Sequence, residues 1–125
     1  MYVKSIIPEF VTKDIDKTIE FYNGILKLNI ISKYPKEKPV WVKFGVRDSF
    51  IMFETNESIG MVIPELKEKT IDGSFNIYIE VENIEGMYAE IKDSVNVIVP
   101  LIDSPFKQFA IKDVNGYILL IGQHN

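Results

Sequence analysis

The chain contains no cysteine, and its single histidine, His124, is the penultimate of 125 residues. Without thiols the protein cannot form a disulfide, a zinc ribbon or a cysteine nucleophile, and this absence is typical of a reducing compartment. No histidine lies within the body of the chain to activate a serine, threonine or tyrosine hydroxyl. The composition therefore excludes the commonest nucleophile–base pairs.

Long apolar runs and a dominant sign of charge are also lacking. No segment approaches the roughly eighteen apolar residues of a membrane-spanning helix, and the first apolar stretch is too short for a signal peptide. The net charge is −4, and lysines alternate with acids instead of forming a basic patch. We therefore expect a cytoplasmic protein of one domain, with neither a membrane nor a nucleic acid as partner.

A strand followed by a capped helix occurs twice in the chain. The apolar run 6–11 precedes Asp14-Ile15, and the run 75–81 precedes Asn83-Ile84. Asp and Asn are preferred helix N-caps because their side-chain oxygens accept from free N–H groups in the first turn. A duplicated strand–helix unit in so short a chain restricts the fold sharply.

The remaining patterns complete two copies of a βαβββ unit. The predicted strands are Val3–Val11, Leu28–Ser32, Val40–Val46, Phe50–Thr55, Phe75–Val81, Val95–Val99, Gln108–Lys112 and Tyr117–Gln123. The predicted helices begin at the two caps and end near Asn23-Gly24 and Lys92. We expect an α+β fold over a single domain, 1–125, with module one at 1–58, a linker at 59–73 and module two at 74–125. A connection this long usually covers a cavity or reaches a partner subunit.

Three phrases at this spacing carry a family resemblance. They are Ile7–Asp14, Phe21-Tyr22 followed by Leu26, and Phe109–Tyr117 with its Asp-Val-Asn-Gly turn. Together they resemble the glyoxalase/bleomycin-resistance/extradiol-dioxygenase superfamily, also called vicinal oxygen chelate proteins, over essentially the whole chain. The resemblance implies two curved sheets around a cup-shaped cavity, usually in a homodimer.

Enzymes of that superfamily hold a divalent metal with one residue from the first and one from the last strand of each module, normally His or Glu. In this chain the family's spacing places these positions at Ile7, Met52, Asn76 and Leu120. Two aliphatic side chains, a thioether and an amide are not a competent ligand set for a catalytic metal. We therefore expect no metal, no other cofactor and no catalytic residue, and we expect His124 to be a solvated tail residue.

The departure from the metal-binding pattern favours the bleomycin-resistance branch, which sequesters a ligand without reacting it. The chain resembles that branch in its Ile7-Pro8 opening, in Trp41 on the third strand and in Gln123 at the end of the last. The resemblance implies a metal-independent protein that binds a small molecule, such as an antibiotic, as a homodimer.

Alternation along the strands extends the candidate site. Side chains two residues apart share a face, so Glu9 and Glu54 share the faces of Ile7 and Met52. By the same rule Asn76, Tyr78 and Glu80 share a face. Acids around an apolar cavity would attract a cationic ligand, whereas an irregularity at Pro8 and positions at the sheet rims would leave them in solvent. Both interpretations remain open here.

Trp41 is the only tryptophan and shares a strand face with Lys43, opposite Val42. Its indole could stack on a flat conjugated ligand or simply pack the sheet. Tyr22 and Phe109 are expected to be structural. The predicted ligand-binding residues are Glu9, Trp41, Met52, Glu54, Asn76, Tyr78, Phe106 and Leu120.

Two other functions remain compatible with the residues. One is a lyase, isomerase or dioxygenase with a non-standard metal arrangement around Glu9, Glu54 and Glu80. The other is an interaction module whose cavity is filled by its own side chains. A binding protein for a cationic aromatic molecule remains the prediction that the residues favour.

Overall fold

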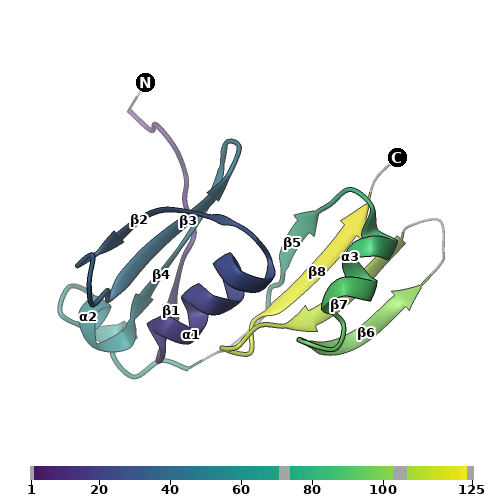
Figure 1. The fold of residues 1–125 in the computed structure, drawn as a ribbon. Helices are drawn as coiled ribbons and strands as arrows, with labels where there is room; N and C mark the ends of the chain where they lie inside the picture. Colours follow the sequence, from purple (N-terminus) through teal and green to yellow (C-terminus); the bar gives the residue numbers. More distant parts are fainter. Residues whose placement is uncertain (1, 71–73, 103–106, 124–125) are drawn as a thin grey trace. The chain divides into compact units, whose positions relative to one another are not determined.

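The computed structural model describes residues 2–70, 74–102 and 107–123. The chain divides into two compact units, Met1–Thr70 and Ile71–Asn125. Each unit has one four-stranded sheet with helical structure on one face (Figure 1). The predicted α+β fold with two tandem modules is therefore confirmed.

The first unit has the predicted element order. Its elements are β1 (Glu9–Thr12), α1 (Ile15–Ile19), the π-helix η1 (Glu20–Ile25), β2 (Asn29–Tyr34), β3 (Trp41–Val46), β4 (Ser49–Thr55), α2 (Asn56–Gly60) and the 3-10 helix η2 (Pro64–Leu66). The sheet order is β1-β4-β3-β2, in which β1 is parallel to β4 and the other pairs are antiparallel.

The second unit repeats this topology. Its elements are β5 (Ile77–Glu80), α3 (Ile84–Ile91), β6 (Asn96–Ile102), β7 (Lys107–Lys112) and β8 (Ile118–Gln123). The sheet order is β5-β8-β7-β6, again with the first strand parallel to the last. A helix between two parallel strands of one sheet is the standard crossover connection.

An aromatic cluster under the helix forms the core of the first unit. The Tyr22 ring centroid lies 4.8 Å from that of Phe53 and 5.5 Å from that of Phe44. All three side chains are buried, and Val42 is buried beside them. Alternation on β3 and β4 therefore divides the sheet into a helix-covered face and an opposite face, which we call the open face of the first sheet.

The second unit is packed in the same way. Phe109 is fully buried, and its ring centroid lies 4.9 Å from that of Tyr88 on α3. Ile84, Leu119 and Ile121 are also buried. Tyr22 in the first unit and Phe109 in the second are thus core residues, as predicted.

Both predicted N-caps are present. Asp14 Oδ1 accepts a hydrogen bond from the Lys17 backbone N–H at 3.0 Å, and Asn83 Oδ1 accepts from Gly86 at 3.3 Å. Gln123 adds a cap that the sequence did not indicate, because its Oε1 accepts from the Ile84 N–H at 2.8 Å. Its side chain thereby ties the last strand to the start of α3.

The first strand begins later than predicted. The pattern indicated a strand over Val3–Val11, but β1 starts at Glu9. Pro8 has no N–H to donate, and its carbonyl accepts from Met52 N at 3.0 Å just before the regular pairing begins. The side chains of Tyr2 and Ile6 are exposed. β1 lies at an edge of the sheet, where a proline without an N–H is tolerated.

The first helix continues past its predicted stop at Asn23-Gly24. Asn23 lies inside the helix, and its Nδ2 donates to the Leu28 carbonyl at 2.8 Å, across the turn that follows. The helix runs to Ile25, and Lys27, at φ 64°, provides the left-handed residue expected of Gly24. The sequence therefore predicted the end of this helix a few residues before its actual end.

The hairpin before the last strand forms as predicted. Gly116 has φ 96°, a conformation that a residue with a side chain rarely adopts. Asp113 is buried, and its Oδ1 accepts from Asn115 N and Tyr117 N, both at 2.8 Å. The Asp and Gly of this phrase therefore build the turn.

Residues 56–70, which we call the connecting segment, are folded. The sequence predicts a linker over 59–73. In the structure η2 lies within this range, and α2 begins before it and ends inside it. Asn56 Nδ2 donates to the carbonyls of Leu66 at 2.8 Å and Lys69 at 2.9 Å. The Asn56 side chain thus holds the start of the connecting segment against its end.

Replacing Asn56 with Ala should loosen the connecting segment while leaving the sheet intact. Each lost hydrogen bond contributes about 0.5–1.5 kcal/mol, so local opening becomes easier. We expect faster backbone hydrogen exchange over Met61–Lys69, measured by mass spectrometry. Glu57→Ala, at an exposed neighbouring position, is the control. Equal exchange in wild type and N56A would contradict the anchoring role.

Candidate ligand-binding site

The open face of the first sheet carries four of the predicted site residues. Strand register places partners side by side on one face, in two successive rows. The rows are Glu9, Met52 and Lys43, followed by Val11, Glu54 and Trp41. The structure therefore brings together Glu9, Trp41, Met52 and Glu54.

A hydrogen bond joins Trp41 to Glu9 across the sheet. Trp41 Nε1 donates to Glu9 Oε2 at 3.1 Å, although β1 and β3 are separated by β4. The two side chains consequently meet above β4, and the indole N–H has the partner that such groups usually find. Trp41 is half-buried, so part of its surface remains accessible.

The Glu54 carboxylate is hydrogen-bonded to the connecting segment. Its Oε2 accepts a hydrogen bond from the Ser58 hydroxyl at 2.6 Å, and Ser58 lies on α2. Within residues 2–70, 74–102 and 107–123 the one ion pair joins Lys107 to Glu85. Glu9 and Glu54 thus share a face, each is held by a neutral donor, and among the described residues neither is paired with a lysine or arginine.

The charge of Glu54 affects the titration of Glu9. Partial burial raises the pKa of Glu9, the Glu54 charge raises it further, and the Trp41 hydrogen bond opposes both effects. Glu9 is exposed as a residue, but its carboxyl group lies above β4 and is partly shielded from water. Two like charges in this arrangement favour either a bound cation or a retained proton.

An aromatic surface adjoins the acidic pair. A Cβ built on Gly45 would lie only 2.8 Å from Phe50 Cδ1 and 2.9 Å from Ile31 Cγ1, so glycine allows both side chains to lie close over the backbone. Lys43 Nζ lies 4.5 Å from the Phe50 ring centroid. The lysine on this face therefore contacts an aromatic ring.

The other described candidates lie in the second unit. Tyr78 and Leu120 are register partners on the sheet face opposite α3. Tyr78 is 46% exposed, and its hydroxyl would lie 2.5 Å from a Cβ built on Gly122. Asn76 precedes β5 and is exposed, as is Glu80 at its end. Phe106 and His124 lie outside the described residues.

The donor set does not fit the metal site that the fold family implies. Ile7 precedes β1, and the register places Glu9 beside Met52 and Tyr78 beside Leu120. Aliphatic and thioether groups do not bind the hard or borderline cations that such enzymes use. Across the described ranges, no group of three or more His, Cys, Asp or Glu side chains could hold a metal ion.

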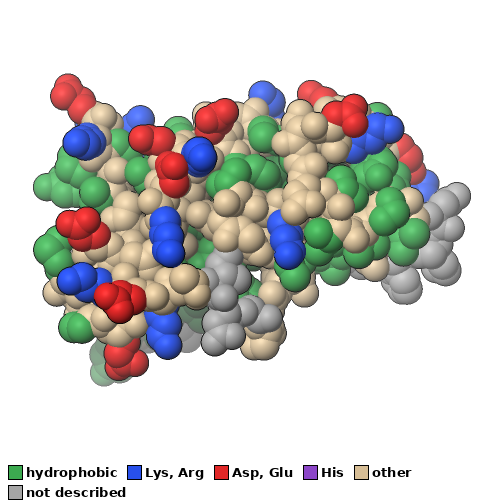
Figure 2. All heavy atoms as spheres, turned by 90° about the horizontal axis from the view of Figure 1, so that it is seen from below, with side chains coloured by type: hydrophobic (Ala, Val, Ile, Leu, Met, Phe, Trp, Pro, Cys, Tyr) green, Lys and Arg blue, Asp and Glu red, His purple; other side chains and the backbone are tan. Residues whose placement is uncertain are grey.

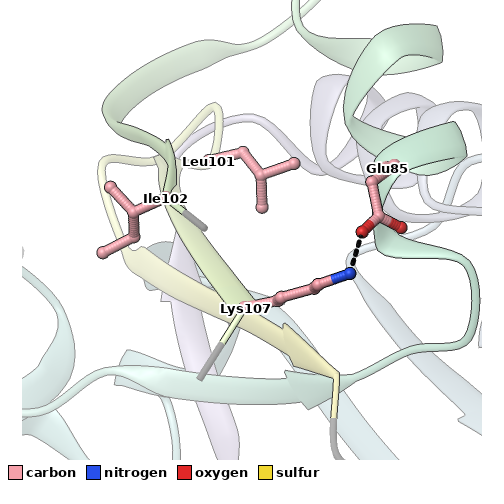
Figure 3. A pocket seen from close by; sticks show the side chains of 4 residues that line it. All are labelled: Glu85, Leu101, Ile102 and Lys107. Atoms are coloured by element: carbon pink, nitrogen blue, oxygen red, sulfur yellow. Dashed lines mark hydrogen bonds and ion pairs between the residues drawn. The ribbon is translucent and has the colours of Figure 1, made fainter. Parts of the chain in front are cut away.

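A pocket that the sequence did not indicate lies in the second unit. It has a volume of about 210 Å³ and is lined by Glu85, Leu101, Ile102 and Lys107 (Figure 3). Lys107 Nζ points to Glu85 Oε1 at 2.6 Å, and this bond lowers the pKa of the Glu85 carboxyl. The polar groups of the pocket are therefore paired with each other.

Charged side chains of both signs share one face in the space-filling view (Figure 2). Acidic and basic side chains are interspersed over the face seen in Figure 2, in line with the modest net charge of −4. No helix in the described part of the chain is long and apolar enough to cross a membrane.

Ser58 is the site residue that sequence reasoning missed. It follows Glu54 by four residues, and its backbone N–H donates to the Thr55 hydroxyl at 3.2 Å. The Thr55–Ser58 spacing is typical of a helix N-cap and could have indicated α2. The sequence held no signal that the hydroxyl of Ser58 would turn back to Glu54.

A family model described as the Glyoxalase/Bleomycin resistance protein/Dioxygenase superfamily matches residues 6–121. A comparison with curated proteins finds no match.

Solved structures with the same fold cover nearly the whole chain. A protein of unknown function from Agrobacterium tumefaciens superposes with a TM-score of 0.81 at 18% identity, covering 99% of this chain and 98% of the other. A hypothetical protein from S. aureus has a TM-score of 0.80 at 17% identity, covering 99% and 96%. A glyoxalase/bleomycin resistance protein/dioxygenase from Nocardioides has a TM-score of 0.73 at 15% identity, covering 98% and 85%. At these identities the likeness establishes the fold alone.

Trp41 fluorescence should report the ionisation of Glu9, because the only indole is bonded to that carboxyl. The pH midpoint should lie above the ordinary glutamate value. Glu54→Gln should lower it by removing a like charge. Glu20→Gln, an exposed acid on the helix side, should leave it unchanged. A midpoint that E54Q does not move would contradict the coupling.

The ionisation of Glu9 should also make the free energy of unfolding depend on pH, in a direction that the pKa shift determines. Because folding raises the pKa of Glu9, the native state holds more protons than the unfolded chain between the two pKa values. The free energy of unfolding should therefore decrease as pH rises from the unfolded pKa through the folded one. Urea unfolding over this range should show a shallower decrease for Glu9→Gln than for wild type. Equal slopes would exclude a raised Glu9 pKa.

Proposed function

Because this chain belongs to the glyoxalase/bleomycin resistance protein/dioxygenase superfamily, we propose that it binds a small cationic aromatic molecule without a metal. The proposal depends mainly on one observation. Glu9 and Glu54 lie next to the only tryptophan, and neither has a cationic partner within the described residues. Binding is then the function, and the relevant quantity is affinity rather than turnover.

The geometry supports recognition of an ammonium or amidinium group. Trp41 and Ser58 each occupy an Oε2 atom, of Glu9 and Glu54 respectively. The carboxylates retain further acceptor capacity, and hydrogen bonds between ionised groups are stronger than neutral ones. A cation placed between them also relieves their mutual repulsion.

The apolar part of the ligand has suitable neighbours. Met52 lies between Glu9 and Lys43 in the same row, and a thioether adapts to irregular shapes. Trp41 and Phe50 are half-buried aromatic side chains on this face. Aromatic rings bind flat conjugated groups at low cost in side-chain entropy.

Sequestration of an antibiotic or a similar molecule in the cytoplasm by a homodimer completes the proposal. Tyr78, Asn76 and Leu120 form a second set of candidate contacts on the open side of the other sheet.

Benzamidinium and benzamide provide a direct test, because they share a planar aromatic shape and differ in charge. We expect calorimetry to show saturable binding of benzamidinium and little binding of benzamide. Glu9→Gln and Glu54→Gln should each weaken binding by about tenfold or more, since a hydrogen bond to a charged group contributes about 1.5–3 kcal/mol. Bleomycin should be titrated in parallel.

Glu20→Gln removes the same charge from the helix-covered side of the first unit and should bind like wild type. Equal affinity for the charged and neutral probes would rule out cation recognition. Metal retained stoichiometrically after dialysis, by elemental analysis, would instead support an enzyme with a non-standard metal site.

A further inference from the structure

We propose that Ser58 is a positioning residue of the acidic site, so that the connecting segment is a functional part of that site. This inference rests on the proposed function. The main observation behind it is the 2.6 Å hydrogen bond from the Ser58 hydroxyl to Glu54 Oε2. The bond reaches from α2 to β4 and is partly buried, so water competes with it less than at an exposed position.

Ser58 is itself held in place by two independent sets of contacts. Its backbone N–H donates to the Thr55 hydroxyl at 3.2 Å, which caps α2. Asn56, two residues earlier, is bonded to the Leu66 and Lys69 carbonyls. The hydroxyl that reaches Glu54 therefore projects from a segment fixed at both ends.

The hydrogen bond from Ser58 fixes the orientation of the Glu54 carboxylate. A glutamate side chain at a strand end can adopt several rotamers, and a single short hydrogen bond selects among them. With its Oε2 bonded to Ser58, the Glu54 carboxylate stays close enough to Glu9 to affect its titration. Ser58 thus maintains the like-charge pair that the proposed cation would bridge.

The other ionisable groups near Glu9 do not substitute for Glu54. Lys43 shares the row of Glu9, but its ammonium lies over the Phe50 ring. Tyr34 is the register partner of Trp41, and Glu57 on α2 is exposed. A substitution at Ser58 should therefore alter the titration of Glu9 by changing the position of the Glu54 carboxylate.

The test compares Ser58→Ala with Ser58→Thr, which keeps the hydroxyl. In S58A the pH midpoint of Trp41 fluorescence should fall toward that of E54Q, and benzamidinium should bind about threefold to tenfold more weakly. S58T should restore both quantities toward wild type. Ser49→Ala, at the exposed start of β4, should change neither. Circular dichroism checks that each variant is folded.

The possible failures are distinguishable. If wild type binds benzamidinium but a folded S58A keeps the wild-type midpoint and affinity, the positioning role is wrong and the proposed function stands. If wild type does not bind benzamidinium, the proposed function fails and the positioning of a cation site fails with it. A midpoint that falls in S58A and returns in S58T supports the inference, because a merely structural serine would not move the titration of Glu9.

Discussion

The parallel pairing of the first and last strands within each unit is the constraint on which the structure depends. β1 pairs with β4, and β5 pairs with β8, each pair being joined through a helix and two further strands. This closure gives each sheet one helix-covered face and one open face. It also sets the register, which places Glu9 beside Met52 and Tyr78 beside Leu120. A slip of one residue would exchange the two faces and bury the acids.

The chemistry of the open face follows from that register. Glu9 comes from an edge strand, Glu54 from the strand next to it and Trp41 from the third, so all three meet above β4. Each acid is held by a neutral donor, and within the described residues neither has a cationic partner. Buried or structural charges are usually paired with the opposite sign. The proposed recognition of a cation rests on this arrangement.

Local signals predicted the parts of the fold that depend on neighbouring residues. Asp14 and Asn83 cap helices because their side chains reach the N–H groups three residues ahead. Asp113 builds its turn within four residues. Local signals missed the late start of β1, where Met52 N donates to the Pro8 carbonyl. They also gave no helices in the connecting segment, where Asn56 bonds to the Lys69 carbonyl.

The sequence by itself determined the duplicated βαβββ plan and the alternation of strand faces, as for Met52 with Glu54 and Trp41 with Lys43. These properties follow from periodicity and side-chain chemistry, which are local. Only the tertiary structure decided that Trp41 bonds to Glu9, that Ser58 holds Glu54 and that Gln123 caps α3. The bonds made by Trp41 and Gln123 join residues distant in the chain, and that of Ser58 turns a helix back onto a strand. Such contacts depend on how strands pair and helices pack, and no short pattern encodes them.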